Sequence, residues 1–271
     1  MSTQAPTITK QSPKREKFDL NTVRVSGNVR RIWPSGDDIL LRLAAGDEDA
    51  PTTPRLTVLI PGGCVNGEPV TLMKEDWISV TGHLVEAPYT ETGRQFAERS
   101  RKESLLQDVP GLSNVSTERM ATYIVVETLE YCGKPAAPVL NEAKVEGIVS
   151  SVTQVENQIY VRLAIYDEHT SVRDGKTGKD GRPWRKAHYI SVHFVDGRVN
   201  GRIISLKEKD RVRVSGQLSE RRYSETLAAF LMRAKQIGLL SKAINADDVR
   251  VVRTPRTSTY VQASAMLQFT K

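Results

Sequence analysis

The chain has 271 residues, of which 39% are hydrophobic and 26% charged, a composition typical of a soluble protein with two ordinary domains. It contains no apolar run of about 18 residues, and residues 1–20 lack the apolar segment of a secretory signal, so we expect neither a membrane partner nor export. The two cysteines cannot form a disulfide framework, and neither they nor the four histidines have metal-ligand spacing, so we predict no metal site and no cofactor.

The net charge of +7 is unevenly distributed along the chain. Residues 1–140 contain 16 Lys and Arg against 18 Asp and Glu, whereas residues 141–271 contain 23 against 14. The second half therefore has a large excess of positive charge, which favours a polyanion as its partner.

An internal repeat covers nearly the whole chain. The matching segments are Val23–Ile32 with Ala143–Val152 at an offset of 120, Val65–Thr92 with Val199–Thr226 at 134, and Thr122–Cys132 with Thr259–Phe269 at 137. The first change of offset indicates an insertion in a loop within residues 166–188 of the second half. We predict a disordered basic tail over 1–20, a first domain over 21–133, a linker over 134–142 and a second domain over 143–271.

Alternation and β-branched content predict five short strands in each copy. The expected strands are 22–33, 38–44, 55–60, 77–86 and 122–131 in the first copy, and 143–153, 158–166, 188–195, 211–220 and 259–268 in the second. Glycines at 27, 82, 147 and 216 fall inside strands and indicate bulges or sharp bends. The pattern predicts an all-β chain of two tandem OB-fold barrels, each a five-stranded Greek key, with a β-sandwich as the alternative. We read 199–210, between strands three and four, as a short helix or turn.

The long connections between strands four and five have helical periodicity in both copies. In the second copy an apolar stripe is formed by Phe230, Leu231, Ala234, Ile237 and Leu240. We expect this helical excursion to pack on its own barrel; a contact between the two copies, or between chains, is the alternative.

The stretch "VNGRIISLKEKDRVRVSGQLSERRYSE", residues 199–225, resembles the bacterial single-stranded DNA-binding protein family. The resemblance rests on five features that occur in the same order. They are an aromatic strand end at Phe194, a basic residue after Gly197, a Lys-rich turn ending at Asp210, a valine-alternating strand, and an Arg-rich hairpin at Arg221. It covers most of 143–226 and, more loosely, 22–92. It implies an OB fold that binds single-stranded DNA without strong sequence preference. The family usually has one such domain per chain, assembled as four, and an acidic C-terminal tip. This chain has two domains and ends "SAMLQFTK", so recruitment through a tail is not expected.

Single-strand binding needs cations that follow the phosphates and flat side chains on which bases stack. In an OB barrel the ligand crosses the outer face of strands two and three, beside the loops after strands one and four. Alternation predicts that Tyr160, Arg162, Tyr189 and an exposed His193 face outwards. The predicted binding residues of the second copy are Trp184, Arg185, Lys186, Tyr189, Tyr160, Arg162, Arg221, Arg222 and Tyr223, and those of the first are Arg42, Arg55 and Tyr89. The second barrel is expected to dominate.

Several alternatives remain open. Arg162 could equally be a solvated strand residue, Tyr89 and Tyr223 could be packing residues, and Trp33 and Trp77 are expected to pack rather than stack on bases. No nucleophile elbow, phosphate loop, zinc-protease motif or paired acid with a histidine occurs, so we predict no catalytic residue and no enzyme.

The leading hypothesis is a sequence-nonspecific single-stranded DNA-binding protein of replication, repair or recombination, cytoplasmic and associated with the nucleoid. We expect a homodimer with four barrels and, as further partners, replication or recombination proteins. The alternatives are a primosome-like or plasmid-encoded adaptor in which one barrel binds a protein, and an RNA-binding OB-fold protein.

Overall fold

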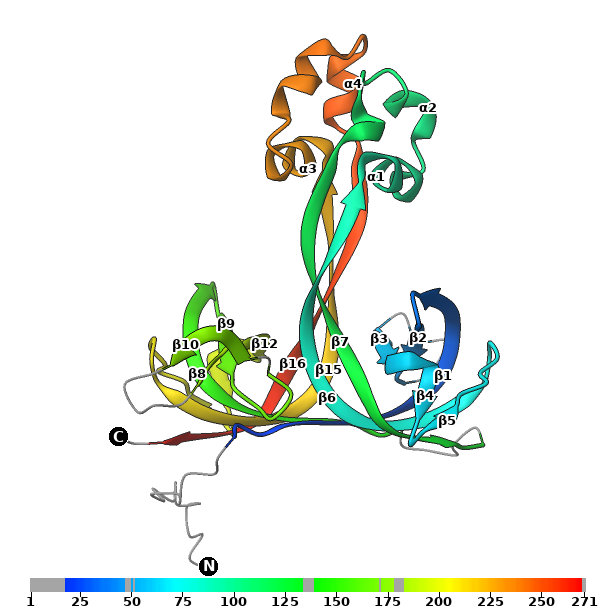
Figure 1. Cartoon of the computed structure of the whole chain (residues 1–271). Coiled ribbons are helices and arrows are strands. Elements are labelled where there is room, and N and C mark those ends of the chain that lie inside the picture. Colours follow the sequence, from blue (N-terminus) through cyan, green and yellow to red (C-terminus); the bar gives the residue numbers. More distant parts are fainter. Residues whose placement is uncertain are drawn as a thin grey trace, which may run out of the picture. The chain divides into compact units, whose positions relative to one another are not determined.

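The computed structural model describes residues 18–46, 50, 52–133, 139–170, 172–177 and 183–269, with 172–177, 183 and 184 described by their backbone only. Within these residues, ten strands form one sheet in the order β15-β16-β12-β9-β8-β1-β2-β3-β7-β6, and additional β1–β6 and β15–β8 pairings close it into two rings (Figure 1). The first ring consists of β1 (Asn21–Ser35), β2 (Asp38–Ala44), β3 (Arg55–Ile60), β6 (Trp77–Thr92) and β7 (Ser116–Tyr131). The second consists of β8 (Asn141–Val155), β9 (Gln158–Ile165), β12 (His188–Phe194), β15 (Arg211–Thr226) and β16 (Arg253–Phe269).

Each ring is a five-stranded barrel of the OB type. The first three strands of each ring pair antiparallel in sequence, and the third strand pairs parallel with the last, β3 with β7 and β12 with β16. The all-β, tandem OB-fold prediction is confirmed, and the β-sandwich alternative is wrong. Strands one to three agree with their predicted bounds within about two residues, whereas β6, β7, β15 and β16 extend well beyond theirs.

The strand glycines permit close approach between strands. A Cβ at Gly82 would lie 1.9 Å from the carbonyl oxygen of Val125, and one at Gly216 would lie 2.0 Å from that of Gln262. A side chain at either glycine would therefore not fit where its strand crosses the neighbouring one. The irregular pairings of β1 and β8 do not lie at Gly27 and Gly147 but beyond them, between Val29 and Arg31 in β1 and at the equivalent place in β8.

A β-hairpin with a tight turn follows the third strand, where a short helix or turn is expected. In the second copy a 3₁₀ turn, η3 (Val195–Gly197), leads into β13 (Arg198–Val199) and β14 (Arg202–Ile203); the first copy has η1 (Pro61–Gly63), β4 (Cys64–Val65) and β5 (Glu68–Pro69). The turn residues Asn200 and Gly201 have positive φ, 49° and 76°. The equivalent residues of the first copy, Asn66 and Gly67, also have positive φ, 53° and 82°. Asn-Gly with both residues at positive φ is the signature of a two-residue type I′ hairpin, so of the two alternatives predicted for this stretch the turn is correct and the helix is wrong.

The compact units of the molecule do not follow the two sequence halves. The barrel unit combines residues 1–86, 122–219 and 259–271, and the helical unit combines 87–121 and 220–258. The helical unit contains α1 (Gly93–Ser100), α2 (Glu103–Leu106), η2 (Leu112–Asn114), α3 (Leu227–Arg233), η4 (Ile237–Lys242) and α4 (Ala246–Arg250). None of the helices within the described residues has the length and apolar character needed to cross a membrane.

The helical unit has a hydrophobic core of its own, built from both copies. Phe96 of α1 and Phe230 of α3 are fully buried, and their ring centroids lie 4.9 Å apart. Leu106, Leu112, Leu231 and further apolar residues of both copies complete the core. The expectation that each excursion packs on its own barrel was wrong, and the alternative of a contact between the copies is correct. Ile237 does not belong to the apolar face that was predicted for it, because α3 ends at Arg233. The side chain of Ile237 is exposed.

The two barrels are joined directly within the barrel unit. Asn21–Val25 of β1 pair antiparallel with Asn141–Val145 of β8. Each of the two paired strands is also held to its own barrel. Asn21 exchanges two hydrogen bonds with the backbone of Leu84 at 2.9 and 3.0 Å, and Asn141 exchanges two with that of Leu218, both at 2.9 Å. At the same junction Asp19 accepts a hydrogen bond from the Tyr166 amide at 2.8 Å, and burial raises the pKa of Asp19 despite its ion pair with Arg211.

The predicted tail and linker fall largely outside the described residues. Of the tail, only Phe18, Asp19 and Leu20 are described, and the linker is described at 139–142, where Asn141 and Glu142 already belong to β8.

Candidate nucleic-acid interface

The outer face of β9 and β12 carries the predicted polar and aromatic residues. Ile159, Val161 and Leu163 of β9 point into the core, as do Ile190, Val192 and Phe194 of β12, all at 8% exposure or less. Tyr160 and Arg162 alternate with the first set, and Tyr189, Ser191 and His193 with the second. The predicted orientation of both strands is therefore confirmed by burial.

An aromatic cluster lies on this face. The rings of Tyr160 and His193 are stacked, with centroids 4.4 Å apart and planes 5° from parallel, and Tyr260 of β16 meets His193 edge-on at 5.4 Å. His193 is only 9% exposed and its Nε2 lies 2.7 Å from Gln158 Oε1, so the expectation of an exposed His193 was wrong. Tyr260 was missed, although the repeat matches it to Tyr123 and so marks a place that both barrels fill with tyrosine.

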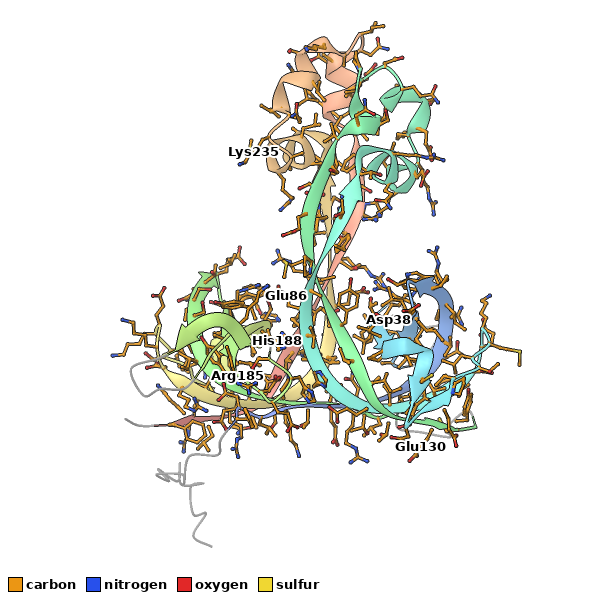
Figure 2. All side chains as sticks on the ribbon, viewed as in Figure 1. Asp38, Glu86, Glu130, Arg185, His188 and Lys235 are labelled. Atoms are coloured by element: carbon orange, nitrogen blue, oxygen red, sulfur yellow. The ribbon has the colours of Figure 1, made fainter. Side chains whose placement is uncertain are left out.

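Arg162 is tied to the first half of the chain. Its Nη2 donates to both oxygens of Glu86 at 2.5 and 2.6 Å, and its guanidinium lies 5.3 Å from the ring centroid of Tyr189. Glu86 lies on β6 and is labelled in Figure 2. The Glu86 side chain is 10% exposed and the Arg162 side chain 39%. Arg162 therefore supports the exposed Tyr189 ring, while its charge is partly neutralised by Glu86.

The first barrel differs at the equivalent positions. Tyr160 pairs with His193 across β9 and β12, and the pair at the same place in β2 and β3 is Leu40 with Leu59. Arg42 corresponds to Arg162 and donates a hydrogen bond to Thr57, whereas Arg55 is exposed at the start of β3. The first barrel thus keeps the arginine and replaces the stacked rings with aliphatic side chains.

The inserted segment forms a small hairpin of β10 (Val172–Thr177) and β11 (Pro183–Arg185). Trp184 lies in β11, and its side chain is outside the described part of the structure. Arg185 donates to the carbonyl oxygen of Thr170 at 2.8 Å and lies 5.0 Å from the Phe18 ring centroid, while Lys186 is exposed. Arg185 is therefore a packing residue of this loop as well as a candidate cation.

The remaining predicted residues belong to the other compact unit. Tyr89 lies in the part of β6, and Arg221, Arg222 and Tyr223 in the part of β15, that belong to the helical unit. Tyr89 is half-buried and the other three are exposed. The structure thus assigns the predicted set to two units, and on the face of β9 and β12 it brings together Tyr160, Arg162 and Tyr189.

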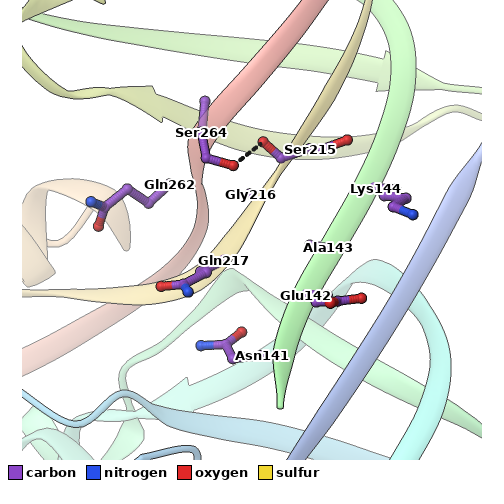
Figure 3. Close-up of a pocket in the computed structure, with 10 residues that line it drawn as sticks. Asn141, Glu142, Ala143, Lys144, Ser215, Gly216, Gln217, Gln262 and Ser264 are labelled. Atoms are coloured by element: carbon purple, nitrogen blue, oxygen red, sulfur yellow. Dashed lines mark hydrogen bonds between the residues drawn. The ribbon is translucent and has the colours of Figure 1, made fainter. Parts of the chain in front are cut away.

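A shallow pocket of about 450 Å³ lies elsewhere in the barrel unit (Figure 3). It is lined by residues 141–144 of β8, 215–217 of β15 and 262–264 of β16, and Ser264 donates to the carbonyl oxygen of Ser215 at 3.2 Å. None of the twelve predicted binding residues lines it.

Fold and site together define an all-β protein of two tandem OB folds, with an aromatic face on the second barrel. No family model and no curated protein matches the sequence. Among solved structures, a deletion mutant of the single-stranded DNA-binding protein from Thermus aquaticus is similar, with 13% identity, a TM-score of 0.50, and coverage of 94% of this chain and 97% of that one. The wild-type Thermus aquaticus protein matches with 14% identity, a TM-score of 0.48 and coverage of 94% and 95%. At 13% identity, the similarity between this chain and the deletion mutant shows a shared fold alone.

Proposed function

We propose that this protein binds single-stranded DNA without strong sequence preference, with the outer face of β9 and β12 as its principal site. The observation that carries the proposal is the stacked Tyr160–His193 pair and, on the same strand face, the exposed Tyr189, where OB folds bind polymers. The fold shared with a single-stranded DNA-binding protein of Thermus aquaticus supports it. The positive charge of the second half supplies attraction to phosphate.

The physical basis is stacking on a pre-organised platform. Unpaired bases stack on aromatic rings with about 1–3 kcal/mol per base and with little regard to sequence. Tyr160 is held by His193, which is itself fixed by Tyr260 and Gln158, so little rotamer freedom is lost on binding. In a duplex the same base faces are covered by their neighbours, which favours the single strand.

The proposal is tested by titrating the full chain with oligo-dT at two salt concentrations, following tryptophan emission, with duplex DNA and oligo-U as competitors. We expect saturable binding, weaker at high salt because phosphate contacts release counterions, and poor competition by duplex. Equal competition by oligo-U would favour the RNA-binding alternative. Absence of binding, or equal affinity for duplex, would contradict the proposal and favour the protein-binding adaptor.

A matched pair of substitutions tests the principal site. Tyr160→Ala removes the stacked ring of the second barrel and should weaken oligo-dT binding by about 5- to 150-fold, the equivalent of about 1–3 kcal/mol. Leu40→Ala, at the same position of the first barrel, should change affinity little. Circular dichroism of both variants controls for folding. Equal losses in the two variants would contradict the assignment to the second barrel.

We further propose a homodimer that presents four barrels in the cytoplasm and acts in DNA replication, repair or recombination. Duplicated barrels lengthen the site for a repetitive polymer. The tether between them makes the second contact intramolecular, at a high effective concentration. Light scattering should give twice the 30.2 kDa of the chain; a mass of one chain would contradict the dimer and leave DNA binding to its own test.

A further inference from the structure

Three potential metal ligands meet in the barrel unit, although they are far apart in sequence. They are His83 on β6, Glu127 on β7 and His169 in the segment after β9. Glu127 Oε1 lies 2.8 Å from His83 Nδ1 and 3.4 Å from His169 Nε2, and all three donor atoms lie within 4.8 Å of one another. The two imidazole rings are stacked, with centroids 3.6 Å apart. Two ligands thus come from the first half of the chain and one from the second.

The segment that carries His169 is held in place by Asp167. This carboxylate is 3% exposed, accepts a hydrogen bond from the His169 amide at 3.1 Å, and accepts another from the side chain of Asn21. Thr170 Oγ1 donates to the Asp167 carbonyl oxygen at 2.6 Å. The position of His169 is therefore fixed relative to β1 of the first half.

Two imidazole nitrogens and one carboxylate oxygen form a ligand set that Zn²⁺ takes in proteins. In a tetrahedral zinc site the donor atoms lie about 3.4 Å apart, as follows from zinc–ligand distances of about 2.0–2.2 Å. The 3.4 Å between His169 Nε2 and Glu127 Oε1 matches this spacing. The 2.8 Å between His83 Nδ1 and Glu127 Oε1 is a hydrogen-bond distance, so these two atoms move apart when an ion enters between them. Coordination by both rings requires their planes to open from parallel, by rotation about χ2, which is a broad torsion in histidine.

We infer that His83, His169 and Glu127 bind one divalent transition-metal ion, with Zn²⁺ as the preferred ion, and that this ion links the two halves of the chain. The fourth position is open to water or to Glu168, whose exposed carboxylate lies 3.6 Å from His169 Nε2. The site is independent of the proposed DNA-binding function.

The second barrel supplies an internal comparison. The repeat matches His83 to Gln217 and Glu127 to Ser264, and both of these residues line the open pocket of Figure 3. The same place in the fold thus holds two strong ligands in the first barrel, where His169 reaches it, and an amide and a hydroxyl in the second. The first barrel therefore has metal-coordinating side chains, His83 and Glu127, at the place where His169 of the second half lies.

The test uses the untagged full chain, stripped with EDTA and kept reduced. Titration with Zn²⁺ by calorimetry should give one saturable site per chain, and Co²⁺ should give the visible absorption bands of a tetrahedral ion. His169→Gln and His83→Gln should lower the zinc affinity by about 100-fold, since loss of an outer-shell partner alone costs about 10–100-fold. His83→Gln also copies the residue of the second barrel.

Two controls keep the outcome decisive. His193→Gln removes a histidine outside the site and should leave stoichiometry and affinity unchanged, which separates this site from zinc bound by other imidazoles. In the wild type, Zn²⁺ should slow amide exchange over Tyr166–Thr170, and His169→Gln should abolish that effect. Unaltered zinc binding in His83→Gln and His169→Gln, or an equal loss in His193→Gln, would overturn the proposal.

Discussion

At the scale of single residues, the helical unit depends on two buried carboxylates that occupy matching positions of the repeat. Glu225 accepts from Arg119 at 2.7 Å, Arg256 at 2.8 Å and Arg233 at 2.7 Å. Glu91 is paired with Arg256 at 2.7 Å, Arg99 at 3.1 Å and Arg119 at 3.3 Å. Each carboxylate thus meets arginines of both copies, and the ion pairs specify how the two excursions face each other.

Replacement of Glu225 should destabilise the helical unit strongly. Glu225→Gln leaves the buried Arg119 and Arg256 with too little negative charge, which costs about 3–5 kcal/mol for a broken buried pair. Arg250→Ala is the matched control in the same unit, because its ion pair with Asp247 is exposed on both sides and is worth about 1 kcal/mol or less. Native-state amide exchange over α1 and α3 measures both. Similar losses of protection in the two variants would contradict this account.

The same carboxylate gives the helical unit a pH dependence. Burial opposes ionisation of Glu225, but the hydrogen bond from Arg233 and the charges of Arg256 and Arg119 outweigh it and hold its pKa below the ordinary value. The stabilisation is present above the unfolded-state pKa, about 4.3, and is lost as the pH falls through the lower folded-state pKa. Protection of α3 should therefore fall below about pH 4 in the wild type and depend less on pH in Glu225→Gln; parallel curves would exclude Glu225 as the cause.

At the scale of elements, the close crossing of β15 and β16 requires glycine. A Cβ at Gly216 would lie 2.0 Å from the Gln262 carbonyl oxygen, so Gly216→Ala forces the strands apart and should cost about 1–3 kcal/mol or prevent folding. Gly133→Ala is the control in the same unit, because no atom lies within 4 Å of its added Cβ. The midpoint of urea unfolding, followed by tryptophan fluorescence, should fall only in the first variant. An unchanged midpoint in Gly216→Ala would show that the strands can separate at no cost.

Elements that depend on local alternation could be predicted from the sequence. Burial alternates strictly along 55–60 and in the middle of 38–44, and β3 and β2 have these predicted bounds. The "VNGR" turn carries a type I′ signal, Asn200-Gly201, which would have decided between the helix and the turn predicted for 199–210. The ends of β6 and β15 could not be predicted, because the residues beyond 86 and 220 are held in strands by long-range pairing and by buried ion pairs rather than by alternation.

Residues of the candidate site could be predicted where their place depends only on the direction in which a strand side chain points. Tyr160, Arg162 and Tyr189 follow from strand alternation. The partner of Arg162, Glu86, lies 76 residues away in the other copy, and no local pattern relates the two. The same holds for His83, Glu127 and His169, whose proximity depends on how the barrels are joined. The sequence prediction of no metal site used spacing along the chain, which does not report on such contacts.

At the scale of the whole molecule, the repeat does not divide the chain into two independent halves. The helical unit takes Phe96 from one copy and Phe230 from the other, and β8 of the second barrel pairs with β1 of the first. A deletion of residues 1–140 would therefore remove half of a core and expose the edge of β8, in addition to removing a barrel.

The chain should instead behave as two fragments that need each other. Residues 1–136 and 137–271, produced separately, should each lack amide protection in their helices, because each supplies only half of the helical core. Co-expression should give a one-to-one complex with protection restored in α1 and α3, since the barrel contacts and the Glu91 and Glu225 ion pairs form between the fragments. Copurification of one fragment through an affinity tag on the other separates this complex from a homodimer of one fragment, in which a second copy of the repeat substitutes for its partner. A monomeric 137–271 fragment with wild-type protection in α3 would show that the second copy folds alone, and that the shared core is not needed for it.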